Sequence, residues 1–380
     1  MRDRIAHLRA LKLRAAGDAA GAEAVLLDIV ARDPGDGDAY RMLSDIAFVR
    51  GDGAAGLALQ RSALERQRLY SRIAPDERRR VVVLCAPGDF TANAPLELVT
   101  DPVTTTLHQY YCVEGADAAE IPAADVAVVA MGESPWVVPH LRIANRLLRR
   151  TGLPAINRPS RILGSNRAKL ARTVAGMRDL TMAPVVDTPR AVLAAATEGF
   201  PLAVRPLGSQ AGERFERLED AAQRDAYLDA NADAAFFVSP FVPYANADGY
   251  YRKYRYAIVD GEPYPYHLGI STRWKVHYYS TVDDHRLWMR EEEARFLTDG
   301  DGGRTDGLTD ALRGLAARMG LEYFCADCTI GPDGRPLLFE ADAAMLVHGI
   351  DPTGEFAYKR PQQQRIFAAF EAMLDRRITS

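Results

Sequence analysis

Three acidic residues, Asp327, Glu340 and Asp342, fall within one short stretch, CADCTIGPDGRPLLFEADAAM (residues 325–345). The Asp-Gly pair in its middle favours a two-residue turn, so the flanking apolar runs are predicted to pair as antiparallel strands. Side chains alternate along a strand, so the three carboxylates share one face, where opposed residues lie ~4.5–5.5 Å apart. Like charges that close repel unless a cation lies between them, and oxygen ligands favour a hard ion. The stretch therefore predicts a Mg²⁺ site made of these three carboxylates.

The plainer alternative is a solvated strand face, on which acidic residues are common. Strands are depleted in Asp, and three acids on one face favour the metal site over that alternative. The opposite face would carry residues that suit a core, namely Cys328, Ile330, Leu337 and Phe339. Cys325 and Cys328 are three residues apart and point to opposite faces of a strand, so a shared zinc or redox role is not indicated.

A second set of residues could hold phosphate groups. The segment GSQAG (residues 208–212) follows the strand-like run FPLAVRP, and its small residues would let backbone N–H groups approach phosphate oxygens. Lys169, on an amphipathic helix predicted over 166–180, and Arg205 could neutralise phosphate charge. Taken singly, the segment is more simply a plain loop, and Lys169 a solvated helix residue.

The segment HLGISTRWKVHYYST (residues 267–281) gathers cationic and aromatic residues. If it is a strand, Arg273, Lys275 and His277 share one face. A cationic stripe suits an anionic substrate or a triphosphate, and the segment directly follows a predicted hairpin, so contact with substrate is favoured over a surface strand. The predicted substrate residues are His267, Ser271, Arg273, Lys275 and His277.

The composition is that of a soluble globular protein. The chain has 380 residues, enough for two or three domains, with 48% apolar and 26% charged residues. A net charge of −4 argues against a general nucleic-acid binder, and four scattered cysteines fit a reducing compartment. The start of the chain lacks the apolar core of a secretory signal, and no apolar run reaches membrane-spanning length. We therefore expect a cytoplasmic protein with neither nucleic acid nor membrane as a partner.

The first 75 residues form an all-α region in pattern and contain a repeat. AAGDAAGA at 15–22 recurs as VRGDGAAG at 49–56, with Gly-Asp at each turn and Pro34 after the first helix pair. The pattern resembles a tetratricopeptide unit, although its Trp is lacking. Two repeats make little concave surface, which favours docking on the rest of the chain or formation of a homodimer over capture of a peptide.

The remainder alternates strands and helices and is α/β in class. Residues 77–158 contain the buried-strand runs VVVLCAP and DVAVVAMGES and a helix, which predict a small, largely parallel α/β domain; no GxGxxG motif is present. Residues 159–380 form the third predicted domain, which includes a hairpin over 254–269 that turns at Asp260-Gly261.

In their order and spacing, residues 157–345 resemble the ATP-grasp superfamily, and within it the branch of glutathione synthases and ribosomal-protein glutamate ligases. Lys169 matches the first nucleotide-contacting lysine of that branch, and Arg205 stands where a second lysine is usual. GSQAG resembles the Gly-rich loop over the phosphates, and FVSPFV resembles the hinge that holds adenine by backbone groups. The nucleotide-binding residues that the resemblance implies are Lys169, Arg205, Ser209, Gln210, Gly212, Ser239, Phe241 and Val242.

The resemblance also implies an activity. Arg255 matches an arginine that contacts the transferred phosphoryl group or the acyl intermediate, and Asp342 stands where the last metal ligand is usually Asn. An ATP- and Mg²⁺-dependent ligase is expected, which joins a small-molecule or peptide carboxylate to an amine through an acyl phosphate. Two alternatives stay open. One is a kinase-like phosphotransferase. The other is a helical-repeat interaction protein whose ATP-grasp part is degenerate, which is suggested by Arg205 and Asp342 because they depart from the residues usual in the family.

Overall fold

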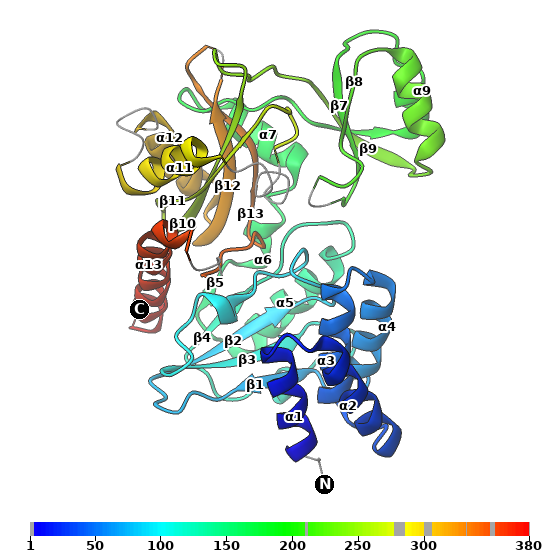
Figure 1. Ribbon diagram of the computed structural model, residues 1–380, viewed down its shortest axis with the longest axis vertical. Helices are drawn as coiled ribbons and strands as arrows, with labels where there is room; N and C mark the ends of the chain where they lie inside the picture. The colour runs from blue at the N-terminus through cyan, green and yellow to red at the C-terminus, as the bar shows by residue number, and fades with distance from the viewer. Residues whose placement is uncertain are drawn as a thin grey trace.

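The computed structural model describes residues 4–209, 212–276, 286–299, 306–331, 333–349 and 354–379. These residues form three sheets with flanking helices, preceded by an all-α region, and this confirms the α/β class expected from the sequence. Figure 1 shows the helical region beside the first sheet, with the two later sheets above them and the lobe of one sheet standing apart. No helix among the described residues is long and apolar enough to cross a bilayer.

The N-terminal region consists of two helix hairpins within residues 4–64. The helices are α1 (Arg4–Ala15), α2 (Ala19–Arg32), α3 (Gly37–Val49) and α4 (Gly53–Leu64). Each hairpin turns at a glycine with positive φ, Gly17 at 81° and Gly51 at 82°, followed by an Asp that caps the next helix. The repeat seen in the sequence is therefore a repeat in local geometry, while membership of the tetratricopeptide class stays a prediction.

The helical region packs against the first sheet. Ala63 and Leu64 of α4 belong to the apolar core of that sheet, and the Arg41 guanidinium of α3 lies 5.0 Å from the centre of the Tyr70 ring. Tyr70 is on β1 (Leu69–Arg72), a strand that the sequence did not predict and that extends the sheet toward the helices. These contacts agree with docking on the rest of the chain.

The first sheet has the order β1-β3-β2-β4-β5, parallel except for β1. Its other strands are β2 (Arg79–Cys85), β3 (Thr105–Tyr111), β4 (Val126–Val129) and β5 (Ala155–Ile156), with the short helices η1 (Leu96–Leu98) and η2 (Ala118–Glu120) and the helices α5 (Val138–Thr151) and α6 (Pro159–Ile162) in the connections. β2 and β4 are buried apolar runs, as central parallel strands require.

The second sheet is antiparallel and forms the lobe that stands apart in Figure 1. It has the order β6-β9-β7-β8, with strands β6 (Val186–Pro189), β7 (Leu202–Pro206), β8 (Glu216–Leu218) and β9 (Ala235–Pro240). Helices α8 (Arg190–Ala194) and α9 (Ala221–Ala230) complete the lobe, which has its own apolar core around Val204 and Phe236.

The third sheet is also antiparallel, in the order β11-β10-β12-β13. Its strands are β10 (Tyr251–Val259), β11 (Glu262–Ser271), β12 (Tyr323–Ile330) and β13 (Pro336–Asp342), and the nearby helices are α7 (Arg167–Ala175), α11 (Leu287–Asp299), α12 (Asp306–Met319), η3 (Ala357–Lys359) and α13 (Arg360–Thr379). β10 and β11 turn at Asp260 and Gly261, both with positive φ, as predicted for that hairpin.

Candidate active site

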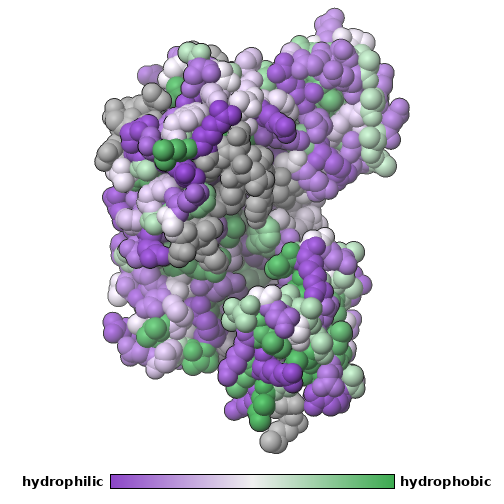
Figure 2. Space-filling view, viewed as in Figure 1, coloured by the Kyte–Doolittle hydropathy of each residue, from purple (hydrophilic) through white to green (hydrophobic). Residues whose placement is uncertain are grey.

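A cavity of about 310 Å³ lies between the second and third sheets. Its walls include Arg205 and Ser239 from the second sheet and Arg255 and Glu340 from the third, and Phe90 reaches it from the loop after β2. That loop belongs to the first sheet and its connecting helices, which are called the first domain below. Figure 2 shows a hollow in the surface between the lobe of the second sheet and the N-terminal helical region. Seven of the residues singled out in the sequence therefore line one pocket: Arg205, Gly212, Ser239, Arg255, His267, Glu340 and Asp342.

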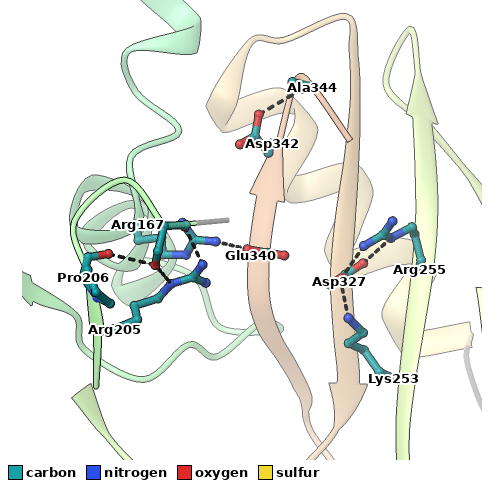
Figure 3. A network of polar contacts seen from close by, with 10 residues as sticks. Arg167, Arg205, Pro206, Lys253, Arg255, Asp327, Glu340, Asp342 and Ala344 are labelled. Carbon is teal, nitrogen blue, oxygen red and sulfur yellow. Dashed lines mark hydrogen bonds and ion pairs between the residues drawn. The ribbon is translucent and has the colours of Figure 1, made fainter. Parts of the chain in front are cut away.

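The three predicted metal ligands lie on paired strands. Asp327 of β12 is opposite Glu340 of β13, and Cys325 is opposite Asp342, as the sequence predicted. Each carboxylate already has its own partner in the structure, shown in Figure 3. Among the described residues, no group of three His, Cys, Asp or Glu side chains is arranged to hold one ion.

Both carboxylate oxygens of Asp327 accept hydrogen bonds from cationic side chains. Arg255 donates from Nε to Oδ1 at 2.6 Å and from Nη2 to Oδ2 at 2.8 Å, and Lys253 donates to Oδ2 at 2.8 Å. Asp327 is 0% exposed, so burial opposes its charge, but the attraction of Arg255 and Lys253 prevails and holds the pKa of Asp327 far below its usual range. In this arrangement Asp327 is the counter-ion of two cations, and it does not fit the predicted role of a metal ligand.

Glu340 and Asp342 fit a cation better. Both line the pocket two residues apart on β13. Burial, with Glu340 and Glu133 nearby, raises the pKa of Asp342 to about 6, although the Ala344 N–H donates to its Oδ1 at 2.9 Å. A carboxylate whose charge is disfavoured gains from a cation, and Mg²⁺ is commonly bound by one or two carboxylates together with substrate phosphates.

The turn between β12 and β13 differs from the prediction. The pairing shifts by one residue between Asp327 and Cys328, and the Asp-Gly pair lies in a longer loop closed by a 2.7 Å bond from the Gly331 N–H to the Arg335 carbonyl. The shift is a β-bulge, which turns Phe339 into the pocket. The prediction that Phe339 packs in the core beside Cys328 was therefore wrong, because the tight turn does not form.

Two arginines supply a cationic wall. Arg205 is 8% exposed and donates from Nε to the Ser209 hydroxyl at 3.0 Å. Arg167, at the first turn of α7, lines the same pocket and pairs with Glu340. Burial, together with the nearby positive charge of Arg167, lowers the pKa of Arg205 to about 9. Two cations that disfavour each other in a buried site favour an anion between them.

Lys169 does not reach this wall. Its side chain is exposed, and Nζ donates to the Leu163 carbonyl at 2.7 Å. Arg167 lies two residues earlier, about 200° around the helix, and takes the inward position. The structure therefore gives Arg167 the place that the spacing had suggested for Lys169.

The Gly-rich segment lies beside Arg205. Ser209 is 6% exposed and accepts from Arg205, and Gly212 lines the pocket, while Gln210 lies outside the described residues. Gly208 has φ of +79°, and a Cβ there would lie 3.3 Å from Pro135 of the first domain. Where the structure describes it, the segment lies beside the pocket and close to the loop that follows β4.

The far end of the pocket is apolar. Ser239, Phe241 and Val242, the predicted hinge, line a smaller adjoining cavity of about 160 Å³ with Trp274 and Phe339. The rings of Phe241 and Trp274 meet edge to face with centroids 5.4 Å apart. An aromatic slot next to main-chain groups suits a planar heterocycle.

The cationic stripe predicted over 273–277 does not form on a strand. β11 ends at Ser271, whose hydroxyl accepts the Arg273 N–H at 3.0 Å in the bend that follows. Arg273 is exposed, and Lys275 donates to the Phe215 carbonyl at 2.9 Å. Neither these two residues nor Ser271 line the pocket, and His277 lies outside the described residues.

His267, by contrast, is at the pocket. It pairs across the sheet with Arg255, and a bulge at that point brings Tyr266 to the pocket as well. Its Nδ1 lies 2.5 Å from Oε1 of Glu293 on α11, a fully buried carboxylate that Lys359 also approaches at 3.4 Å. Burial lowers the pKa of His267, although the charge of Glu293 and the hydrogen bond to it oppose that shift.

Several residues of the site were not found from the sequence. Lys253 shares a face with the predicted Arg255 two residues later, so strand alternation could have indicated it. To predict that Arg167 faces the pocket, one must know at which residue α7 begins. That start is set by the Asn166 side chain, which caps the helix by accepting the Ala168 N–H. Glu293 and Phe90 lie far away in the sequence, and no local pattern marks them.

Comparisons with known proteins add the following findings. No family model and no curated protein matches the chain. Among solved structures, a RimK domain protein ATP-grasp from Sphaerobacter thermophilus is 15% identical with a TM-score of 0.48, over 79% of this chain and 100% of that one. VanG D-Ala:D-Ser ligase from Enterococcus faecalis is 9% identical with a TM-score of 0.49, over 78% and 99%. D-cycloserine synthetase DcsG is 15% identical with a TM-score of 0.45, over 76% and 99%.

Proposed function

We propose that this chain is an ATP- and Mg²⁺-dependent ligase that joins a carboxylate to an amine through an acyl phosphate. One observation carries the proposal: a single pocket holds the buried Arg205 and the half-buried Arg167 together with the carboxylates Glu340 and Asp342, with an aromatic slot at its far end. Such a pocket matches the parts of a metal-bound nucleoside triphosphate in order: planar base, anionic phosphates and hard cation.

The nucleotide would lie along the second sheet. Its base fits the slot of Phe241 and Trp274, where the main chain of the hinge can read its edge. Its phosphates would enter between Arg167 and Arg205 and relieve the repulsion that lowers the pKa of Arg205. The segment around Ser209 would then cover them, since Arg205 already holds that loop.

Glu340 and Asp342 would hold the metal ion. Bound there, Mg²⁺ neutralises phosphate charge as it develops during transfer. Asp342 must give up its proton to bind, and its pKa of about 6 makes that step easy near neutral pH. Glu340 must exchange its pairing with Arg167, which frees that guanidinium for a phosphate oxygen.

Arg255 and Lys253 would bind the reacting acyl group. Asp327 accepts hydrogen bonds from Nε and Nη2 of Arg255, which fixes the guanidinium plane. Nη1 would then donate to an oxygen of the acyl phosphate. Fixed donors of this kind stabilise charge that appears only in the transition state. The carboxylate and amine would meet near His267 and Phe90, the walls of the pocket beyond the phosphate end.

The test is a screen of purified protein for release of ADP from ATP and Mg²⁺, with pools of amino acids and short peptides. A ligase releases ADP only when both a carboxylate and an amine are present, and yields an amide product. Release with a hydroxyl or carboxylate alone, with a phosphorylated product, would make it a phosphotransferase. Failure of Mg-ATP and Mg-ADP to bind, measured by calorimetry, would leave the interaction protein with a degenerate site.

A further inference from the structure

The loop over residues 86–94 brings the first domain to the active site. It follows β2, and its tip places Phe90 and Thr91 in the wall of the main pocket. The loop is built to one shape: the Asn93 side chain accepts the Ala86 N–H at 2.8 Å and donates to the Ala86 carbonyl at 2.9 Å. Asp89 accepts the Thr91 N–H at 2.8 Å. Phe90, at 48% exposed, stands out from this frame.

The helical region grips the same loop at Gly88. Gln60 of α4, only 4% exposed, accepts the Gly88 N–H at 2.6 Å and donates to the Gly88 carbonyl at 3.1 Å. A side-chain amide thus pairs with one residue's main chain as a neighbouring strand would. This is a specific polar contact between the helical region and the frame of the pocket, in addition to the apolar docking described above.

Gly88 cannot easily be replaced at this point. It has φ of +130°, and a Cβ would lie 2.8 Å from Cβ of Ala92 and 2.9 Å from the Trp136 ring. Trp136 in turn approaches Gly208 of the Gly-rich segment, within 4.0 Å of where its Cβ would stand. Gly88 of the 86–94 loop therefore lies between α4 on one side and Trp136, which approaches the Gly-rich segment, on the other.

We propose that Gln60 is a positioning residue for the ligase reaction: it holds the 86–94 loop so that Phe90 and Thr91 bind the acceptor or carboxylate substrate. This rests on the proposed function, which supplies the substrates. It gives the helical region a role that docking alone does not explain, because the docking contacts of Ala63 and Leu64 are apolar and do not orient a loop. Gln60 touches no substrate, and it acts through Gly88.

The experiment compares Gln60→Leu with Gln67→Leu in the full chain. Leu is close to Gln in size, so both variants keep packing volume and lose only polar contacts. Gln67 also holds the helical region, because its Nε2 donates to Asp38 Oδ1 of α3 at 2.7 Å, so Gln67→Leu controls for general loosening of that region. Hydrogen–deuterium exchange of peptides covering 86–94 and covering β7 is measured with and without Mg-ADP.

Gln60→Leu should raise exchange across 86–94 at least tenfold, because the Gly88 N–H loses its acceptor, while Gln67→Leu should leave that loop as in the wild type. With the amino-acid or peptide pool that supports turnover, Gln60→Leu should raise the concentration for half-maximal ADP release about tenfold and change the KM for ATP less than twofold. Unchanged exchange of 86–94, or an equal effect of both variants, would overturn the proposal.

The two proposals fail in different ways. If Mg-ADP protects β7 in no protein, the nucleotide-dependent function is wrong, and the role of Gln60 in holding the loop is judged on the exchange of 86–94 alone. If Mg-ADP protects β7 in all three proteins but the pool kinetics of Gln60→Leu equal those of the wild type, the ligase stands and Gln60 has only a structural part.

Discussion

The two antiparallel sheets that face the pocket each contribute an arginine, Arg205 buried and Arg255 half-buried, and the two are in opposite electrostatic states. Arg205 of the second sheet bonds to Ser209, and burial together with the positive charge of Arg167 lowers the pKa of Arg205 to about 9. Arg255 of the third sheet overcomes its burial through two bonds to Asp327, and its pKa is raised. Among the described residues no carboxylate forms an ion pair with Arg205, whereas Arg255 is paired with Asp327.

This difference separates two tasks. A cation left uncompensated gains most when an anion arrives, which suits the recruitment of a nucleotide. A cation that is already paired gains less from an arriving anion but is held in a fixed direction, which suits charge that appears only during the reaction. The same residue type thus serves binding on one sheet and orientation on the other, and the distinction is set by the presence of Asp327.

The largest expected effect concerns stability. Arg255→Met leaves Asp327 fully buried with Lys253 as its remaining cation, and breaking a buried pair costs about 3–5 kcal/mol. Arg205→Met removes a cation that burial and Arg167 already disfavour, so its bonds to Ser209 and its contact over the Phe215 ring are lost and the change should stay within about 1–2 kcal/mol. Urea unfolding of the two variants measures the difference. Equal losses of stability would end the contrast between the two arginines.

The next effect tests which carboxylates hold the metal. Glu340→Gln should lower Mg²⁺-dependent ADP release about 100-fold or more, a loss of transition-state stabilisation of about 2.7–4 kcal/mol. Glu262→Gln is the matched control, because Glu262 is on the same sheet and pairs with Arg313 at the exposed end of β11. Wild-type turnover in Glu340→Gln would remove the metal assignment.

A pH measurement probes the charge cluster behind the pocket. Burial opposes the charge of Glu293, yet His267 and Lys359 prevail and lower its pKa to about 2. A depressed carboxyl pKa adds stability that is present above the unfolded pKa of 4.5 and is lost as the pH falls toward 2, a span worth about 3 kcal/mol. Glu293→Gln should therefore melt below the wild type at pH 7, and the gap in Tm should narrow at pH 3. A gap that is constant with pH would contradict the low pKa.

The sequence predicted the strand pairing of the site but not its details. The pairing of Asp327 with Glu340 follows from alternation and a central turn, and it is correct. The bulge that turns Phe339 into the pocket depends on the longer loop, in which the Asp333 side chain accepts the Arg335 N–H at 3.1 Å. Asp-Gly favours a tight turn only on average, and side-chain bonds in a given loop decide otherwise.

Long-range partners were beyond the sequence for a different reason. Asp327 was correctly placed opposite Glu340, but its pairing with Arg255 and Lys253 arises because β10 lies beside β12, and Arg255 is 72 residues away in the chain. The 86–94 loop reaches the pocket because the first sheet and the third sheet share one apolar core, which includes Val83 and Ala257. Local patterns indicate residue types and faces, whereas the order of strands in a sheet decides which charges meet.

The smallest expected effect tests the correction at α7. The resemblance gave Lys169 the nucleotide contact, whereas the structure turns Arg167 inward and Lys169 outward to the Leu163 carbonyl. Arg167→Ala removes one of two cations facing the predicted phosphates, and a lost charged hydrogen bond of about 1.5 kcal/mol should raise the KM for ATP about tenfold. Lys169→Ala should change it less than twofold, because the ammonium is solvated at an exposed position. Calorimetry with Mg-ADP on both variants separates binding from turnover. A larger loss of affinity in Lys169→Ala than in Arg167→Ala would contradict this assignment. It would show that the Lys169 side chain moves into the pocket when the nucleotide binds and that Lys169, not Arg167, is the main phosphate contact of α7.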